Sequence, residues 1–237
     1  GVDGKTFKDL AEMSEEALVR CVRDKILNYQ PKAVRRVYIP KPNGKMRPLG
    51  IPTVIDRIVQ QSVLQVMEPI CEAKFYRHSY GFRPNRSTKN AVAVCYKLAQ
   101  VDGFHYVVDV DIKGFFDNVD HDWLMKFLEH DIQDKNFLRY IKRFLIAGIM
   151  EGTELMDSDR GTPQGGLISP VLANVYLHYV LDLWFEKAVK PKLRGEAYYV
   201  RYADEFLILF QYGNEARQVM EALKPRLGKF SLEVAEE

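Results

Sequence analysis

Cysteine is scarce in this chain of 237 residues: Cys21, Cys71 and Cys95 lie far apart and lack the spacing of metal ligands. Buried free thiols in a reducing compartment are the simplest interpretation. No run of about 18 apolar residues occurs, so we expect no membrane-spanning helix. The first residues, Gly1–Lys5, carry no apolar segment, and we expect no signal peptide there.

The sequence also lacks repeats, low-complexity stretches and flexible linkers, while 47% of its residues are apolar and 12% aromatic. This composition predicts a folded chain with one large or two small domains. The net charge is only +2, but nine basic residues and one acid, Asp24, occur between Arg20 and Arg47. A basic lobe of this kind is typical of a surface that tracks a polyanion, although an ordinary solvated surface explains it equally well.

Periodicity predicts a strand at Val34–Ile39, a turn at Pro42–Gly44 and a return strand to Ile51, followed by helices that begin at Thr53 and Ser87. Further strands and helices are expected in this order: a strand at Phe104–Asp111, helices from Asp120, near Phe137–Ile149 and from Ser169, strands at Ala197–Tyr202 and Phe206–Phe210, a helix from Asn214 to about Leu223, and a last strand at Leu232–Val234. This order predicts an α+β fold, an antiparallel sheet with helices on one face, and a soft boundary near residue 100.

Two acidic segments stand out against apolar strands. Asp109 and Asp111 are two positions apart on the first strand. Because successive side chains of a strand point to opposite sides, these two point to the same side. Asp204 and Glu205 form a hairpin tip that lacks glycine and asparagine, the residues that favour tight turns. If the strands are neighbours, Asp111 and Asp204 converge, and such carboxylates suit two Mg²⁺ ions that act on an in-line phosphoryl displacement. Taken alone, each site is explained more simply by acids at ordinary turns, as solvated groups or helix caps, and only the two together suggest a shared metal site.

Several motifs, taken in their order along the chain, resemble those of a known protein family. The fingers hairpin Tyr38–Pro52, the loop Ser79–Ser87, the block Asp111–Asp117, the block Pro163–Asn174 and the box Tyr202–Glu205 resemble, in order, the blocks of group II intron-encoded reverse transcriptases and maturases. The resemblance covers nearly the whole chain. It implies a right-hand polymerase with fingers at 1–100 and an incomplete palm at 101–237, whose antiparallel sheet is backed by helices and whose thumb is absent.

The resemblance also implies roles for individual residues. The catalytic and metal-binding acids would be Asp111, Asp204 and Glu205, with the Ile112 carbonyl as a further ligand of two Mg²⁺ ions, for which Mn²⁺ can substitute. The nucleotide-binding residues would be Lys41, Lys45, Arg47, Phe115, Phe116, Gln164 and Gly165, with one of the two phenylalanines as the steric gate against ribonucleotides. The template-binding residues would be Gly81, Phe82, Arg83 and Arg86.

The function expected from the resemblance is RNA-directed DNA synthesis from an intron RNA template, a DNA primer and dNTPs, with intron RNA binding that assists splicing and retrohoming. It implies a bacterial, cytoplasmic protein. Glu205 departs from the family, which has aspartate there, and a longer side chain predicts retained metal binding with slower turnover. The absent thumb predicts weak or no activity of the chain alone, and hydrophobic segments left by truncation could pair two copies into a homodimer.

Three alternatives remain open at this stage. The chain could act mainly as an RNA-binding scaffold in splicing, or it could be a diversity-generating or CRISPR-associated relative. It could also be a viral RNA-dependent RNA polymerase. Gln164-Gly165 with Ser169-Pro170 argues against the diversity-generating type, and a bulky gate at Phe115 or Phe116 argues against the RNA polymerase.

Overall fold

The computed structural model describes residues 1–40, 44, 46–100, 102–163 and 165–235. The expected nucleotide-binding residues Lys41, Lys45 and Gln164 lie outside these residues. The chain divides into two compact units: residues 1–69 with 128–169, and residues 70–127 with 170–237. These units differ from the predicted division at residue 100, and that functional division into fingers and palm stays a prediction. Within the described ranges, no helix is both long and apolar enough to cross a membrane.

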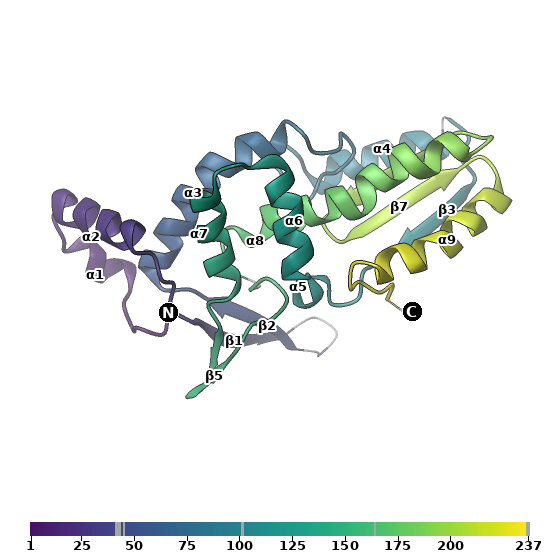
Figure 1. Ribbon diagram of the computed structural model, residues 1–237. Helices are drawn as coiled ribbons and strands as arrows, with labels where there is room; N and C mark the ends of the chain where they lie inside the picture. Colours follow the sequence, from purple (N-terminus) through teal and green to yellow (C-terminus); the bar gives the residue numbers. More distant parts are fainter. Residues whose placement is uncertain (41–43, 45, 101, 164, 236–237) are drawn as a thin grey trace. The chain divides into compact units, whose positions relative to one another are not determined.

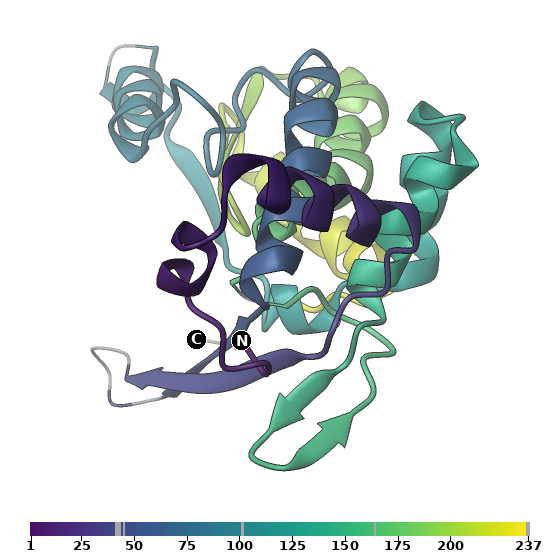
Figure 2. The same cartoon turned by 90° about the vertical axis from the view of Figure 1, so that its left-hand side faces the viewer.

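The first unit is built on a four-stranded sheet with the strand order β2-β1-β4-β5. Its elements are α1 (Phe7–Ala11), α2 (Glu15–Leu27), β1 (Val34–Pro40), β2 (Met46–Ile51), most of α3 (Val54–Glu72), the end of α6 (His121–Asp131), α7 (Lys135–Leu145), β4 (Ile149–Glu151) and β5 (Glu154–Met156). β1 and β2 form the predicted antiparallel hairpin. β4 joins β1 in parallel, with Val34 opposite Ile149, and carries the short β5 beside it (Figure 2).

Local chemistry explains the start of α3. Thr53 caps the helix, because the Asp56 amide donates to its Oγ1 at 3.1 Å and that hydroxyl donates to the Asp56 carboxylate at 2.6 Å. The core of this unit includes Tyr29, whose ring lies 5.0 Å from Phe144 and 5.9 Å from Tyr140 on α7. α7 ends at Leu145, earlier than predicted, because the chain turns at Gly148 (φ +77°) into β4.

The second unit is built on the three-stranded antiparallel sheet β3-β7-β6. Its elements are the end of α3, α4 (Thr88–Gln100), β3 (Tyr106–Val110), α5 (Phe115–Asn118), the start of α6, most of α8 (Ser169–Leu177), two π-helices (His178–Asp182 and Phe185–Val189), a 3₁₀ turn (Lys190–Lys192), β6 (Ala197–Tyr202), β7 (Glu205–Phe210) and α9 (Gly213–Gly228) (Figure 1). α9 starts at Gly213 after Tyr212, so the predicted cap at Asn214 is wrong.

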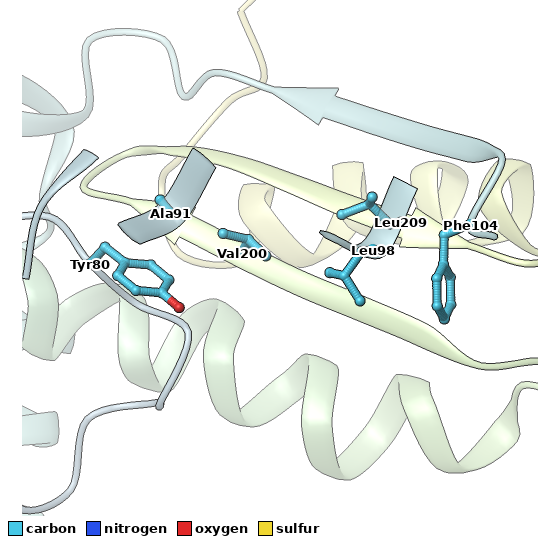
Figure 3. Packing of buried hydrophobic residues seen from close by; sticks show 6 residues of the cluster. All are labelled: Tyr80, Ala91, Leu98, Phe104, Val200 and Leu209. Atoms are coloured by element: carbon cyan, nitrogen blue, oxygen red, sulfur yellow. The ribbon is translucent and has the colours of Figure 1, made fainter. Parts of the chain in front are cut away.

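Helices back this sheet as predicted, but they cover both faces rather than one. On one face Tyr199 packs against Phe185 of the second π-helix at 5.4 Å. On the other face Val200 and Leu209 pack against α4 through a buried cluster (Figure 3): Tyr80, Ala91, Leu98, Phe104, Val200 and Leu209. The alternation of β6 and β7 explains both faces, since consecutive residues of a strand point in opposite directions.

Candidate active site

The carboxylates gather where β3 and β7 lie side by side. Val110 at the end of β3 is paired with Phe206 near the start of β7, so the next residue along β3, Asp111, reaches the level of Glu205. Tyr202 pairs with Glu205 across the β6–β7 hairpin, which leaves Ala203 and Asp204 as its two turn residues. The two acidic segments that the sequence predicts to meet therefore lie at the same end of one sheet.

The charges of these acids act on one another. Partial burial raises the pKa of the Glu205 carboxyl, and the negative charges of Asp111, Asp204 and Asp109 raise it further. Asp111 and Glu205 are themselves exposed. An exposed cluster of mutually repelling carboxylates is the kind of site that a divalent cation stabilises.

The donor set fits Mg²⁺. In the part of the chain that the structure describes, no three His, Cys, Asp or Glu side chains are already arranged around one ion position. Mg²⁺ does not need such a cage, because it usually keeps several waters and takes one or two protein carboxylates together with substrate phosphates. Asp111, Asp204 and Glu205 can supply these carboxylates.

Asp109 belongs to the same cluster, although the predicted site omits it. Asp109 pairs with Leu207, two positions from Glu205 on β7, so both acids lie on the same face of the sheet, and the Asp109 charge helps to raise the pKa of Glu205. Asp109 and Glu205 also border a groove of about 580 Å³ between α4 and the sheet, lined mostly by apolar side chains such as Val107 and Leu207. The sequence already indicated this, because Asp109 and Asp111 are two positions apart on one strand and therefore share a side.

The chain beyond α9 holds Asp111 in place. The Ala235 amide donates to the Asp111 carbonyl at 2.9 Å, and the Lys113 amide donates to the Glu233 carbonyl at 2.9 Å. Ile112 forms an isolated antiparallel bridge with Val234, so the predicted last strand is reduced to this bridge. The Ile112 side chain is buried, which anchors the backbone next to Asp111.

The two candidate gate residues have different surroundings. Phe115 is buried, with its ring 6.3 Å from that of Tyr176. Phe116 is half-buried, and its ring meets Phe82 edge-on at 6.2 Å. Phe115 is therefore part of the core, and Phe116 is the candidate for contact with a nucleotide.

The loop at residues 79–86 is held by its own arginines. Arg83 is buried and donates to the Glu72 carboxylate at 2.9 Å and to the Tyr76 and Ser79 carbonyls. Arg86 donates to the Arg77 carbonyl and lies 5.5 Å from the Tyr80 ring.

These contacts bear on the predicted template residues. The Arg83 guanidinium makes its contacts inside the protein, and its expected contact with a template stays a prediction. Gly81 is also buried, and the backbone of Ala203 fills the space beside it. Phe82, by contrast, is 48% exposed and has a φ of 57°. Phe82 and the half-buried Arg86 present surface to a ligand, and template contact by all four predicted residues stays a prediction.

Two predicted nucleotide-binding residues lie in the first unit. Arg47 is exposed on β2 opposite Ile39. Gly165 has a φ of +109°, and a Cβ there would lie 2.6 Å from the Gly50 carbonyl oxygen. Glycine is needed at 165 for this close packing and backbone conformation, whatever else it contacts.

The sequence matches a known family over most of its length. The model of the family described as "Reverse transcriptase (RNA-dependent DNA polymerase)" matches residues 39–237. The chain belongs to this reverse transcriptase family. It is 40% identical over 188 residues to the group II intron-encoded protein LtrA of Lactococcus lactis subsp. cremoris, which covers 77% of this chain and 31% of LtrA. The predicted resemblance to group II intron reverse transcriptases is thereby confirmed.

Other relatives extend this comparison. Protein YkfC of Escherichia coli strain K12 is 39% identical over 205 residues, which covers 84% of this chain and 53% of YkfC. The reverse transcriptase chain thus spans about half or less of the length of these relatives. Among solved structures, telomerase from Candida albicans matches with a TM-score of 0.67 and 15% identity, covering 90% of this chain and 42% of that one. This likeness shows the fold, which is the predicted right-hand polymerase.

Proposed function

We propose that this chain carries the polymerase centre of an RNA-directed DNA polymerase. The observation that supports this most directly is the convergence of Asp111, Asp204 and Asp109 on Glu205 at the joined ends of β3 and β7. In a protein of the reverse transcriptase family, such a cluster is suited to nucleotidyl transfer with two metal ions.

In the proposed chemistry, the carboxylates bind and position the metal ions. Two bound Mg²⁺ ions would lower the pKa of the primer 3′-hydroxyl and stabilise the departing pyrophosphate. Asp111, Asp204 and Glu205 would hold them, with the Ile112 carbonyl as a further ligand, and Mn²⁺ would substitute. Because the paired strands hold the acidic segments in position, the carboxylates would need to move little during the reaction.

Substrate selection is assigned to other groups. Arg47 would neutralise the triphosphate together with Lys41 and Lys45, since cationic side chains suit phosphate oxygens. Phe116 would occupy the space of a ribose 2′-hydroxyl and so favour dNTPs. Phe82 would stack on a template base, a contact that tolerates any sequence. The remaining predicted nucleotide contacts, Gln164 and Gly165, stay part of this proposal.

A second role in RNA processing is favoured by the names of relatives. One is called a group II intron-encoded protein, and another, 30% identical over 179 residues, is the nuclear intron maturase 2 of Arabidopsis thaliana. We therefore include intron RNA among the partners, with the DNA primer and dNTPs. Assistance in splicing and retrohoming, a cytoplasmic location and a homodimer belong to the same proposal.

One substitution separates the two roles. Asp204→Ala is expected to abolish primer extension and to leave RNA affinity unchanged, because it removes a proposed metal ligand. Asp102→Ala is the matched control, because Asp102 is an exposed acid between α4 and β3. Primer extension on an RNA template and fluorescence anisotropy with labelled intron RNA measure the two effects. Full extension by the Asp204→Ala variant, or a preference for NTPs over dNTPs in the unmodified protein, would contradict the proposal.

A further inference from the structure

Arg201 is the most deeply buried charged residue in the neighbourhood of the acidic turn. It lies on β6, two residues before Ala203, and none of its surface is exposed. Its guanidinium donates to both Asp182 oxygens, from Nε at 2.9 Å and from Nη2 at 2.8 Å. Although burial works against the charged forms, this pairing holds the pKa of Asp182 below its usual value and raises the pKa of Arg201. The pair therefore stays ionised inside the protein.

The remaining nitrogen of Arg201 links this ion pair to the turn. Nη1 donates to the Ala203 carbonyl at 3.0 Å and to Asn174 Oδ1 at 2.9 Å. Ala203 is the first of the two turn residues and has a φ of 57°, a left-handed conformation that is unfavourable for a residue with a side chain. The Arg201 guanidinium is thus hydrogen-bonded to Ala203, the strained residue directly before Asp204.

Asn174 connects the same network to the loop that covers the turn. Its Nδ2 donates to the Gly81 carbonyl at 2.9 Å, and Gly81 packs against the Ala203 backbone. The Tyr80 amide donates to the Arg201 carbonyl at 2.8 Å. Side chains from β6, α8 and the first π-helix therefore restrain both the turn and the loop at Tyr80 and Gly81 that packs against it.

Stability alone is a poor explanation for this network. Replacing a buried ion pair by apolar residues of similar volume is often neutral or stabilising, because two charges no longer need to be desolvated. Arg226 shows the contrast: it donates to backbone carbonyls of the same π-helix, those of Val180 and Tyr179, and among the residues that the structure describes these bonds do not reach the turn. What distinguishes Arg201 is its bond to Ala203.

We propose that Arg201, Asp182 and Asn174 are positioning residues that set the location of the Asp204 and Glu205 carboxylates through the Ala203 carbonyl. This inference rests on the proposed function of those carboxylates. It predicts that loss of the network lowers turnover and weakens the response to Mg²⁺ while RNA and primer still bind.

The test compares the unmodified protein with the double variant Asp182→Leu/Arg201→Met. Thermal unfolding measures folding, a burst experiment counts active sites, and primer extension gives kcat, the dNTP KM and the Mg²⁺ concentration at half-saturation. We expect a folded variant whose kcat per active site falls about 10²-fold, the cost of a misplacement near 1 Å. The Mg²⁺ half-saturation point rises, and primer–template affinity is unchanged.

Arg226→Met is the matched control, since it removes a guanidinium of α9 that donates to the same π-helix, and it should keep the wild-type Mg²⁺ response. A folded double variant with wild-type kcat and Mg²⁺ response would overturn the positioning role. If the double variant does not fold, Asn174→Ala replaces it, because this change keeps the ion pair and removes the link to Gly81. A wild-type Mg²⁺ response of Asn174→Ala would then overturn the inference.

The two proposals fail in distinguishable ways. If the unmodified protein extends no primer, or Asp204→Ala is fully active, the proposed function itself is wrong. If the unmodified protein is active and Asp204→Ala is not, but the network variants keep the wild-type kcat and Mg²⁺ response, only the positioning role is wrong.

Discussion

Alanine at position 81 would displace the acidic turn without removing any functional group. A Cβ on Gly81 would lie 2.3 Å from the Ala203 amide nitrogen and 2.9 Å from its Cα, and both are backbone atoms that cannot rotate away. Ordinary contact begins at 3.4 Å, so the loop and the turn must separate by about 1 Å. Such overpacking costs about 1 to 3 kcal/mol of stability. Because Asp204 follows Ala203, the same shift is expected to slow the chemical step about 10²-fold.

Single-turnover primer extension, normalised to active sites, measures this effect, and thermal unfolding measures the stability. Gly228→Ala is the control, because a Cβ there meets nothing within 4 Å at the end of α9. The control should be neutral or slightly stabilising, since alanine is favoured over glycine in helices. The reasoning would be refuted if Gly81→Ala lowered the melting temperature but extended primers at the wild-type single-turnover rate.

Two further predictions concern the acids and the aromatic gate. Glu205→Asp shortens the side chain by one methylene and is expected to raise primer-extension turnover at saturating Mg²⁺; an unchanged or lower rate would count against the slow-turnover hypothesis. Phe116→Ala is expected to increase NTP incorporation relative to dNTP in competition assays, with little loss of stability. Phe115→Ala should instead lower the free energy of unfolding by about 3 to 5 kcal/mol, because it empties a core position, and equal effects of both variants would argue against the assignment.

Much of the second unit could be predicted because its signals are local. The apolar runs of β3, β6 and β7 predicted strands that the structure confirms within a few residues. The cap at Asp120, whose Oδ1 accepts from the Trp123 amide at 2.9 Å, followed from residue type alone. The convergence of the acidic segments was predicted on the condition that their strands are neighbours, and the pairing of β3 with β7 meets that condition.

The features that were missed depend on partners distant in sequence. β4 and β5 have three residues each, and β4 exists because it pairs with β1, more than a hundred residues earlier. Arginine is rarely buried unless it is paired, so residue type alone does not predict the burial of Arg83 and Arg201. Their acceptors become visible only in the fold: Asp182 lies 19 positions before Arg201, and Glu72 lies 11 before Arg83.

The turn at Ala203 connects these observations. A non-glycine residue at a φ of 57° persists only where its surroundings over-determine it, and here three restraints act on one residue. Strand pairing fixes Tyr202 against Glu205, the Arg201 guanidinium holds the Ala203 carbonyl, and Gly81 closes the space beside it. Because each restraint acts within one residue of Asp204, small shifts in any of them move a charge that the proposed chemistry must place accurately. Turnover should therefore be more sensitive than folding to changes around this turn.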